Sequence, residues 1–282
     1  MQKILIYGAG SGGSRLLEEM RCNSEPYSVM AFIDKRIGGT KKDGLPVIFP
    51  DDIQGYDYDL IFVATLDHSV SDMLHEYYNV PREKINHSRY FNSAEISVRI
   101  RALERFCDLC HLYNLSGSVA ELGVYQGDFA VHINRLFPES TLYLYDTFEG
   151  FVKKDVAQED NEPFVKAYHH YANTTVQLVL GKLPHPDKAV ICKGYFPDSA
   201  VECKDKYVFV SLDADLYAPT LAGLEFFWPK LVSGGAIFIH DFFSKEFTGA
   251  KKAVTEFAHR NQICVSVIGD FVTVAIVKPL FS

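Results

Sequence analysis

Short apolar runs that end at glycine or polar residues recur along this chain and predict the strands of α/β sheets. The runs at 2–7, 29–33 and 59–64 are rich in β-branched and aromatic residues, as is typical of parallel strands buried on both faces. Segments with apolar residues three or four positions apart lie between such runs, and the first of them predicts a helix at 14–21. This alternation predicts a first α/β domain with a mostly parallel sheet.

A long amphipathic segment separates this pattern from a second one. From a capping box at Ser93, a helix is predicted to run to about Tyr113 with one apolar stripe. Further strands are predicted after it, at 119–121, 142–145, 190–192, 207–212 and 236–239, followed by an antiparallel pair at 263–267 and 271–277. We therefore predict two doubly wound, Rossmann-like α/β domains at residues 1–90 and 118–282, with a connecting helix at 91–117.

Two of these strands end at acidic residues that packing does not require. The strand at 207–212 stops at Asp213 and Asp215, and the strand at 236–239 stops at His240 and Asp241. A strand, a helix and a second parallel strand form a right-handed unit, so both strands end at the same sheet edge. Open α/β sheets bind ligands at that edge. The alternative is that Asp213 and Asp215 cap the helix that follows.

The helix between these two strands is predicted from the spacing of its apolar residues. Leu221, Leu224, Phe227 and Leu231 lie on one face, and Ser233-Gly234-Gly235 is predicted to form the C-cap and turn that closes the helix. A polar insertion at 151–187 precedes the stretch and has the position of an acceptor lid. Its His169-His170-Tyr171 segment contacts substrate or lies on a solvated helix face, and a helix is expected at 173–180.

Two glycine-rich turns follow first strands of the predicted domains. Gly8, Gly10 and Gly13 match G-x-G-x-x-G between a strand and a helix, and Asp34 ends the next strand, where dinucleotide-binding folds place a ribose-binding acid. The alternative is that these glycines only permit close packing of helix on strand. Either way, this half of the chain shows no acid or base at a spacing that would support redox catalysis.

The second glycine turn has a different spacing. Glu121, Gly123 and Gly127 form E-x-G-x-x-x-G, the pattern of S-adenosylmethionine-dependent methyltransferases, in which the acid lies near the amino end of the cofactor. Glycine lets the backbone approach a ligand closely. Asp146 ends the next strand, where one carboxylate can accept hydrogen bonds from both ribose hydroxyls. The alternative is two surface acids at strand ends.

Several motifs occur in one order along residues 93–277. They are the Glu121–Gly127 turn, Tyr145-Asp-Thr-Phe-Glu-Gly150, Gly194-Tyr-Phe-Pro-Asp198, Asp213-Ala-Asp-Leu-Tyr217, Ser233-Gly-Gly235 and Asp241. Together they resemble the macrolide-sugar (macrocin, mycinamicin) O-methyltransferases and, more distantly, catechol O-methyltransferase. The resemblance implies a class I methyltransferase fold, S-adenosylmethionine, a divalent cation that is usually magnesium, a sugar hydroxyl as acceptor, and homo-oligomers.

The resemblance also implies roles for single residues. Asp213 and Asp241 would be metal ligands, Asp215 the general base, Asp146 the ribose acid, and Gly194 would lie by the adenine. The chain departs from the family at His240, where a second acid is usual. Magnesium prefers oxygen ligands, whereas imidazole suits transition metals such as manganese. His240 is therefore a ligand for such an ion, or a residue that orients a ligand, or a sign that the metal is weak or absent.

Residues 1–90 resemble the small nucleotide-binding domains that precede sugar-modifying enzymes of surface-polysaccharide pathways. The segment that carries this resemblance runs from Phe32 to Asp52 and continues at 58–65. The resemblance implies a nucleotide or nucleotide-sugar ligand, or an unused pocket.

Composition narrows the classes of partner. The 282 residues are 48% hydrophobic and 23% charged, as in soluble globular proteins, and the net charge of −8 argues against nucleic acid or an anionic membrane as partner. The first apolar run is too short for a signal peptide or a membrane span, so we expect a cytoplasmic protein. The six cysteines show no disulfide or zinc spacing, and Cys107-x-x-Cys110 indicates buried thiols rather than a zinc site.

The sequence therefore predicts an S-adenosylmethionine-dependent, metal-assisted O-methyltransferase that acts on a sugar or nucleotide-sugar of a surface polysaccharide or natural product. A first alternative is an NAD-linked sugar-nucleotide oxidoreductase, which requires a Tyr-x-x-x-Lys or equivalent pair that the chain does not place suitably. A second is a non-catalytic nucleotide-binding protein, which the departure at His240 would favour.

Overall fold

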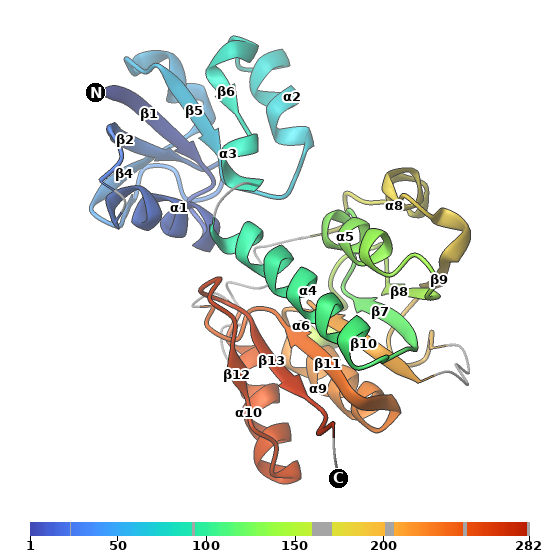
Figure 1. Cartoon of the computed structure of the whole chain (residues 1–282). Helices are drawn as coiled ribbons and strands as arrows, with labels where there is room; N and C mark the ends of the chain where they lie inside the picture. Colours follow the sequence, from blue (N-terminus) through green and yellow to red (C-terminus); the bar gives the residue numbers. More distant parts are fainter. Residues whose placement is uncertain (23, 92–93, 160–170, 201–205, 245–246, 281–282) are drawn as a thin grey trace. The chain divides into compact units, whose positions relative to one another are not determined.

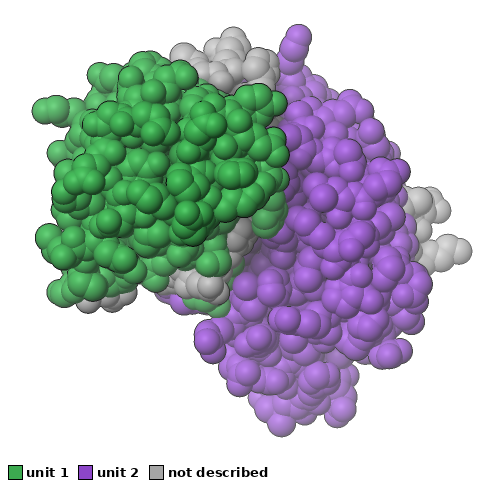
Figure 2. Space-filling model, turned by 90° about the horizontal axis from the view of Figure 1, so that it is seen from above, with its two compact units in different colours: residues 1–97 green, residues 98–282 purple. Residues whose placement is uncertain are grey.

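The computed structural model describes residues 1–22, 24–91, 94–159, 171–200, 206–244 and 247–280 (Figure 1). The chain forms two compact units, residues 1–97 and 98–282, drawn in green and purple in Figure 2. The boundary between them lies within helix α4 (Ala94–Leu112). The division into domains at residues 90 and 118 stays a prediction. Within the described residues, no helix is both long and apolar enough to cross a membrane.

The first unit has a six-stranded sheet in the order β3-β4-β2-β1-β5-β6. Neighbouring strands are parallel except β3 and β4. The strands are β1 (Gln2–Tyr7), β2 (Tyr27–Ile33), β3 (Lys41–Lys42), β4 (Leu45–Ile48), β5 (Leu60–Val63) and β6 (Ile85–Asn86). The helices are α1 (Ser11–Cys22), η1 (Pro50–Gly55), α2 (Ser69–Glu76), η2 (Arg82–Lys84) and α3 (Ser88–Phe91).

Successive strand residues of the first unit point to opposite faces, so its core has two layers. Leu16 and Leu17 of α1 pack with Ile4 and Ile6 on one face. Leu74 of α2 packs on the other face, in a cluster with strand residues such as Leu5. Helices therefore cover both faces of this sheet. That the unit belongs to the Rossmann class stays a prediction.

The second unit has a seven-stranded sheet in the order β12-β13-β11-β10-β7-β8-β9 (Figure 1). Its strands are β7 (Ser118–Leu122), β8 (Leu142–Asp146), β9 (Ala189–Lys193), β10 (Tyr207–Leu212), β11 (Leu231–Ile239), β12 (Ser266–Val267) and β13 (Val274–Val277). The five neighbouring strands β11, β10, β7, β8 and β9 are parallel to one another. Strand β13 is antiparallel to both of its neighbours, β11 and β12. The further helices are α5 (Asp128–Leu136), α6 (Lys153–Val156), α8 (Val176–Lys182), η3 (Pro186–Lys188), α9 (Tyr217–Phe227), η4 (Trp228–Lys230) and α10 (Gly249–Asn261).

Helices also cover both faces of the second sheet. Residues of α4, α5 and α8, among them Leu103, Ile133 and Val179, pack in one cluster with strand residues. Leu224 of α9 and Val254 of α10 pack in the other. The strand order reverses between β7 and β10, which are neighbours in the sheet. Open α/β sheets bind ligands at the carboxyl ends of the strands beside such a reversal, so this edge is where a site is expected.

The prediction that Ser233–Gly235 form a helix C-cap and turn is wrong. Helix α9 ends at Phe227, because Pro229 follows and proline cannot donate the backbone hydrogen bond of a helix interior. Strand β11 already begins at Leu231 and contains Ser233–Gly235. Its register against β10 shifts there, and Gly234 absorbs the irregularity with a φ of +79°.

Other predicted elements are present with shifted ends. The first helix begins at Ser11 instead of residue 14, and the helix expected at 173–180 is α8, whose N-cap Thr175 accepts a hydrogen bond from the backbone N–H of Leu178. The terminal strand pair is antiparallel as predicted but shorter, as β12 and β13. The capping box at Ser93 lies outside the described residues.

Candidate active site

Asp213 and Asp215 follow the last residue of β10 at the carboxyl edge of the seven-stranded sheet. Neither caps the next helix: the N-cap position of α9 is Leu216, and the backbone N–H of Tyr217, its first residue, donates to Oε1 of Glu159 at 2.7 Å. Asp215 has a φ of +57°, a left-handed conformation that turns the loop after β10. This turn buries Asp215, which is 8% exposed, so both acids lie at the sheet edge despite the alternation of the strand.

His240 and Asp241 follow β11, the neighbour of β10, and reach the same place. The Nδ1 atom of His240 lies 2.9 Å from Oδ2 of Asp241 and 3.1 Å from Oδ1 of Asp213. One ligand-type atom from each of these three residues lies within 4.8 Å of the other two, a grouping that can hold a metal ion. The structure thus brings together the three residues predicted as metal ligands.

Arg99 of α4 also belongs to this group, although the sequence alone did not identify it. Its Nη1 donates to Oδ2 of Asp213 at 2.9 Å, and the guanidinium lies over the ring of Phe129, 4.2 Å from its centroid. Arg99 is only 9% exposed. A signal existed, because position 99 is three residues after Ile96 and four before Leu103, on the apolar stripe of the predicted helix. A charge on such a stripe is buried and requires a partner.

The charges of this group shift the pKa values of its members in opposite directions. Burial alone would raise the pKa of Asp213, but His240 and Arg99 outweigh it and hold that pKa well below its ordinary value. Burial alone would lower the pKa of His240, yet Asp213 and Asp241 raise it well above the ordinary value. Burial and then the charges of Asp241 and Asp213 raise the pKa of Asp215 well above normal.

Glu121 lies within β7, opposite Ser211 of β10. The Ser211 hydroxyl donates to its Oε1 at 3.4 Å, while its Oε2 is buried and has no hydrogen-bond partner among the described residues. Burial raises the pKa of Glu121 well above its ordinary value, and the charge of Arg99 opposes this only in part. An unpaired buried carboxylate oxygen is costly, and it indicates a place for a hydrogen-bond donor from a ligand.

Asp146 ends β8 and holds the glycine turn after β7. Its Oδ2 accepts from the backbone N–H groups of Val124 at 2.7 Å and Tyr125 at 2.9 Å, and its Oδ1 accepts from Phe148 at 2.7 Å. Burial raises the pKa of Asp146, and these three hydrogen bonds offset the rise in part. A carboxylate has about four acceptor positions, so about one remains on Oδ1 for a ligand.

Backbone conformation and close contacts require glycine at two positions of the turn after β7. Gly123 has a φ of +86°, and a Cβ there would lie 1.9 Å from the carbonyl oxygen of Asp213. Gly127 has a φ of +79° and precedes α5, with a Cβ position 2.9 Å from Val179. Glycine 123 therefore lets the turn after β7 pass directly against the turn that carries Asp213.

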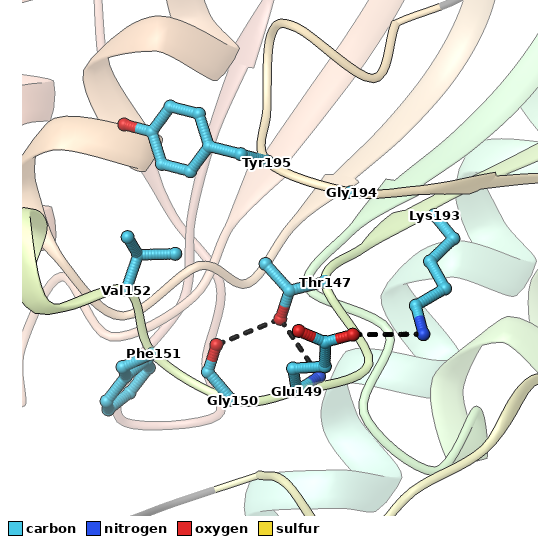
Figure 3. A pocket seen from close by; sticks show the side chains of 8 residues that line it. All are labelled: Thr147, Glu149, Gly150, Phe151, Val152, Lys193, Gly194 and Tyr195. Atoms are coloured by element: carbon cyan, nitrogen blue, oxygen red, sulfur yellow. Dashed lines mark hydrogen bonds and ion pairs between the residues drawn. The ribbon is translucent and has the colours of Figure 1, made fainter.

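A cavity of about 520 Å³ lies beside Asp146, past the carboxyl ends of β8 and β9. It is lined by Thr147, Glu149, Gly150, Phe151, Val152, Lys193, Gly194 and Tyr195. Figure 3 shows the Lys193–Glu149 ion pair at one side of the cavity, with Phe151 and Tyr195 away from it. Its volume is within the range of small-molecule sites, and Gly194, which was predicted to lie by the adenine, is in its wall.

Aromatic side chains from separate loops meet at the same edge of the sheet. Tyr171 packs edge-on against Tyr125 and Phe151, with ring centroids 4.9 and 5.4 Å apart, and Phe151 packs against Phe247. Burial and then the charges of Asp215, Asp241 and Asp213 raise the pKa of Tyr171 well above its ordinary value, so the Tyr171 side chain lies near these three acids. Within the predicted lid, His169 and His170 lie outside the described residues.

The glycine turn of the first unit has a similar plan. Gly8 has a φ of +100°, Gly10 directly precedes α1, and a Cβ at Gly13 would lie 1.9 Å from the carbonyl oxygen of Gly8. Asp34 accepts from the backbone N–H groups of Ala9 at 3.3 Å and Arg36 at 2.8 Å. As with Asp146, a strand-end acid therefore holds the glycine turn of the neighbouring strand.

The two cysteines of the C-x-x-C pair are buried in α4 and free. Cys107 donates to the carbonyl oxygen of Leu136, and burial raises the pKa of Cys110 to about 12. Among the described residues, neither belongs to a group that could hold a metal ion.

Comparisons with known proteins show the family and the fold of this chain. Residues 94–275 match the sequence model of the macrocin-O-methyltransferase (TylF) family, and residues 1–85 match the model described as C2185-like, N-terminal. The solved structure of the O-methyltransferase NovP is 19% identical, with 64% of this chain and 80% of that chain covered and a TM-score of 0.56, which shows a methyltransferase fold. The calicheamicin methyltransferase CalS11 is 16% identical, with 85% and 99% covered and a TM-score of 0.47. No curated protein sequence matches.

Proposed function

The chain belongs to the macrocin-O-methyltransferase family and is an S-adenosylmethionine-dependent O-methyltransferase, and we propose that its acceptor is a hydroxyl of a sugar or nucleotide-sugar. The observation that carries the proposal is the meeting of Asp213, Asp215 and Asp241 at the ends of β10 and β11, beside Glu121 and Asp146 of β7 and β8. Four neighbouring strands thereby supply a cofactor side and an acceptor side at one edge.

On the cofactor side, Glu121 would accept a hydrogen bond from the amino group of S-adenosylmethionine. Its unpaired Oε2 supports this role, because a charged donor would satisfy the buried oxygen. Asp146 would accept from a ribose hydroxyl at the position left on Oδ1. Gly123 and Gly127 would let the backbone approach the cofactor, and the cavity walled by Gly194 would take the adenine.

On the acceptor side, Asp215 would take the proton of the sugar hydroxyl. Its raised pKa suits this role, since a general base works best when its pKa is close to the working pH. Burial and then the charges of Asp241 and Asp213 cause this rise in pKa. The neighbouring acids therefore help to make Asp215 a better general base. Holding the hydroxyl in line with the methyl group can lower the barrier by about 7–11 kcal/mol.

A divalent cation, Mg²⁺ or Mn²⁺, fits the donors present at this edge. Asp213, His240 and Asp241 offer two carboxylates and an imidazole whose ligand atoms converge, and these residues would hold the ion. When bound, such an ion lowers the pKa of a coordinated hydroxyl. Arg99 would keep Asp213 in its orientation through the 2.9 Å hydrogen bond.

The aromatic side chains of Tyr125, Tyr171 and Phe151 would exclude water from the reacting atoms. They come from three loops, their edge-on contacts fix them relative to one another, and Tyr171 lies near Asp215 and Asp241. Exclusion of water strengthens the electrostatic interactions of Asp213, Asp215 and Asp241 with the acceptor.

In the first unit, the turn at Gly8, Gly10 and Gly13 would bind a nucleotide, or the nucleotide part of a nucleotide-sugar, with Asp34 at the ribose. The conformation of Gly8 and the hydrogen bond from Ala9 to Asp34 support this proposal. We further propose a role in the synthesis of a surface polysaccharide or natural-product glycan by a homo-oligomeric, cytoplasmic enzyme. The family match favours methyl transfer over the NAD-linked and non-catalytic alternatives.

The test is transfer of a ¹³C-labelled methyl group from S-adenosylmethionine to UDP- and TDP-linked hexoses, followed by NMR of the products. The proposal expects a new O-methyl ether signal with equimolar S-adenosylhomocysteine, and no such signal with Asp215→Asn. Methyl transfer to nitrogen, carbon or a non-sugar oxygen would contradict the proposed acceptor class.

A further inference from the structure

We infer that His240 sets the ion preference of this centre, so that it binds Mn²⁺ in preference to Mg²⁺, and that Arg99 limits how tightly the centre binds either ion. The inference rests on the proposed function, because it assigns a metal identity to the acceptor side of that site. It follows from two features of the chain itself, an imidazole among the ligand atoms and a buried guanidinium on one of the two carboxylates.

His240 presents a nitrogen at the point where the ligand oxygens converge. Its Nδ1 contacts oxygens of both Asp213 and Asp241, at 3.1 and 2.9 Å, so an ion held by the two acids would face this atom. The side chain is 18% exposed and follows a buried strand, which limits its freedom to turn away. Mg²⁺ strongly prefers oxygen ligands in an octahedron. Mn²⁺ is a transition-metal ion that also favours oxygen ligands but accepts an imidazole nitrogen beside them more readily than Mg²⁺ does.

Arg99 reduces both the charge and the number of oxygens offered to an ion. Its hydrogen bond occupies Oδ2 of Asp213, which leaves Oδ1 as the ligand atom of that residue. The two carboxylates and the one permanently charged guanidinium sum to a single negative charge. The stacking of the guanidinium on Phe129 holds it in place, so it cannot withdraw when an ion binds. A site with few oxygens and little negative charge binds either divalent ion, Mg²⁺ or Mn²⁺, less tightly.

The two residues act by different physical means, and this separates them experimentally. His240 supplies a donor type, so replacing it by aspartate changes the ratio of Mn²⁺ to Mg²⁺ affinity. Arg99 supplies charge, so replacing it by methionine strengthens the binding of both ions by a similar factor, about tenfold or more, and leaves the ratio unchanged. Arg101, exposed on the same helix, provides a matched control.

The experiment titrates MnCl₂ and MgCl₂ separately into the full chain and into Arg99→Met, Arg101→Met, His240→Asp and His240→Gln, by calorimetry. Pulsed electron paramagnetic resonance of bound Mn²⁺ then reports whether an imidazole nitrogen coordinates it. Circular dichroism and S-adenosylmethionine affinity establish that each variant is folded.

The inference expects a ¹⁴N coupling in the wild type that both His240 variants lose. It expects the Mn²⁺/Mg²⁺ affinity ratio to fall by about tenfold or more in His240→Asp, as changes at a metal site commonly do. An unchanged ratio in His240→Asp, absence of the nitrogen coupling, or a wild type that binds S-adenosylmethionine but no Mn²⁺ would each overturn it. These outcomes leave the proposed methyl transfer intact, whereas methyl transfer to a non-sugar oxygen would contradict the proposed acceptor and leave the ion preference standing.

Discussion

Replacing Glu121 by glutamine is expected to weaken cofactor binding and, at the same time, to stabilise the cofactor-free protein. The side chain is 2% exposed, and its Oε2 has no hydrogen-bond partner among the described residues. Its Oε1 accepts a long hydrogen bond of 3.4 Å from the Ser211 hydroxyl. In the free protein this charge is therefore a cost, which the amino group of S-adenosylmethionine would offset on binding.

The size of the effect on affinity follows from the burial. Removing one partner of a buried, hydrogen-bonded charge pair costs about 2–5 kcal/mol. Glutamine retains a neutral acceptor of the same shape, so the lower part of this range applies. A loss of about 2–3 kcal/mol corresponds to roughly a 30- to 150-fold rise in the Kd for S-adenosylmethionine.

The effect on stability has the opposite sign and depends on pH. Burial raises the pKa of Glu121 in the folded protein, so the folded state binds this proton more tightly than the unfolded chain. The wild type therefore loses stability as pH rises above the unfolded pKa of about 4.3 towards the raised folded value. Glutamine does not ionise, so its stability advantage is small at pH 4–5 and larger at pH 8.

Calorimetry with S-adenosylmethionine and thermal unfolding at pH 5 and pH 8 measure both effects. Glu139→Gln is a matched control, because Glu139 is exposed in the same unit. Each kcal/mol of stability corresponds to about 2–4 °C in Tm for a unit of this size. An unchanged Kd in Glu121→Gln, or a lower Tm than wild type at pH 8 without cofactor, would refute the reasoning.

Three further outcomes are expected. Asp215→Asn should lower turnover with UDP- and TDP-hexoses by about 10²–10⁴-fold and leave the affinity for S-adenosylmethionine unchanged. The wild-type rate, measured as release of S-adenosylhomocysteine, should rise as the pH rises through the raised pKa of Asp215. Gly234→Ala should destabilise the fold by about 1–3 kcal/mol in urea unfolding, because its φ is +79° and a Cβ would lie 2.8 Å from Leu115. Asp34→Ala should weaken calorimetric binding of UDP and TDP but not of S-adenosylmethionine; equal binding by wild type and variant would contradict the ribose role.

The sequence was sufficient to predict which edge of the second sheet holds the candidate site and which acidic residues and histidine lie there. Because strand–helix–strand units are right-handed, the strands before Asp213 and His240 must end at the same edge of the sheet. In the structure, Nδ1 of His240 lies 3.1 Å from Oδ1 of Asp213. The family resemblance is confirmed by the match over residues 94–275. Cofactor and metal roles of single residues stay predictions.

What the sequence did not reveal depends on contacts between segments far apart in the chain. Arg99 meets Asp213 across 114 positions, and its place on an apolar stripe was the one local sign of that contact. Asp146 was expected to offer both oxygens to ribose, but three backbone N–H groups already use most of its acceptor positions. The turn predicted at Ser233–Gly235 failed because Pro229 ends the helix earlier, and glycines suit a strand bulge as well as a turn.

The most direct test of the central claim is a crystal structure of the full chain with S-adenosylhomocysteine. We predict that its amino group lies within hydrogen-bonding distance of Oε2 of Glu121, its ribose at Asp146, and its adenine in the cavity walled by Gly194. Binding of the ligand at the glycine turn of the first unit instead, or an unoccupied sheet edge at saturating ligand, would contradict the account.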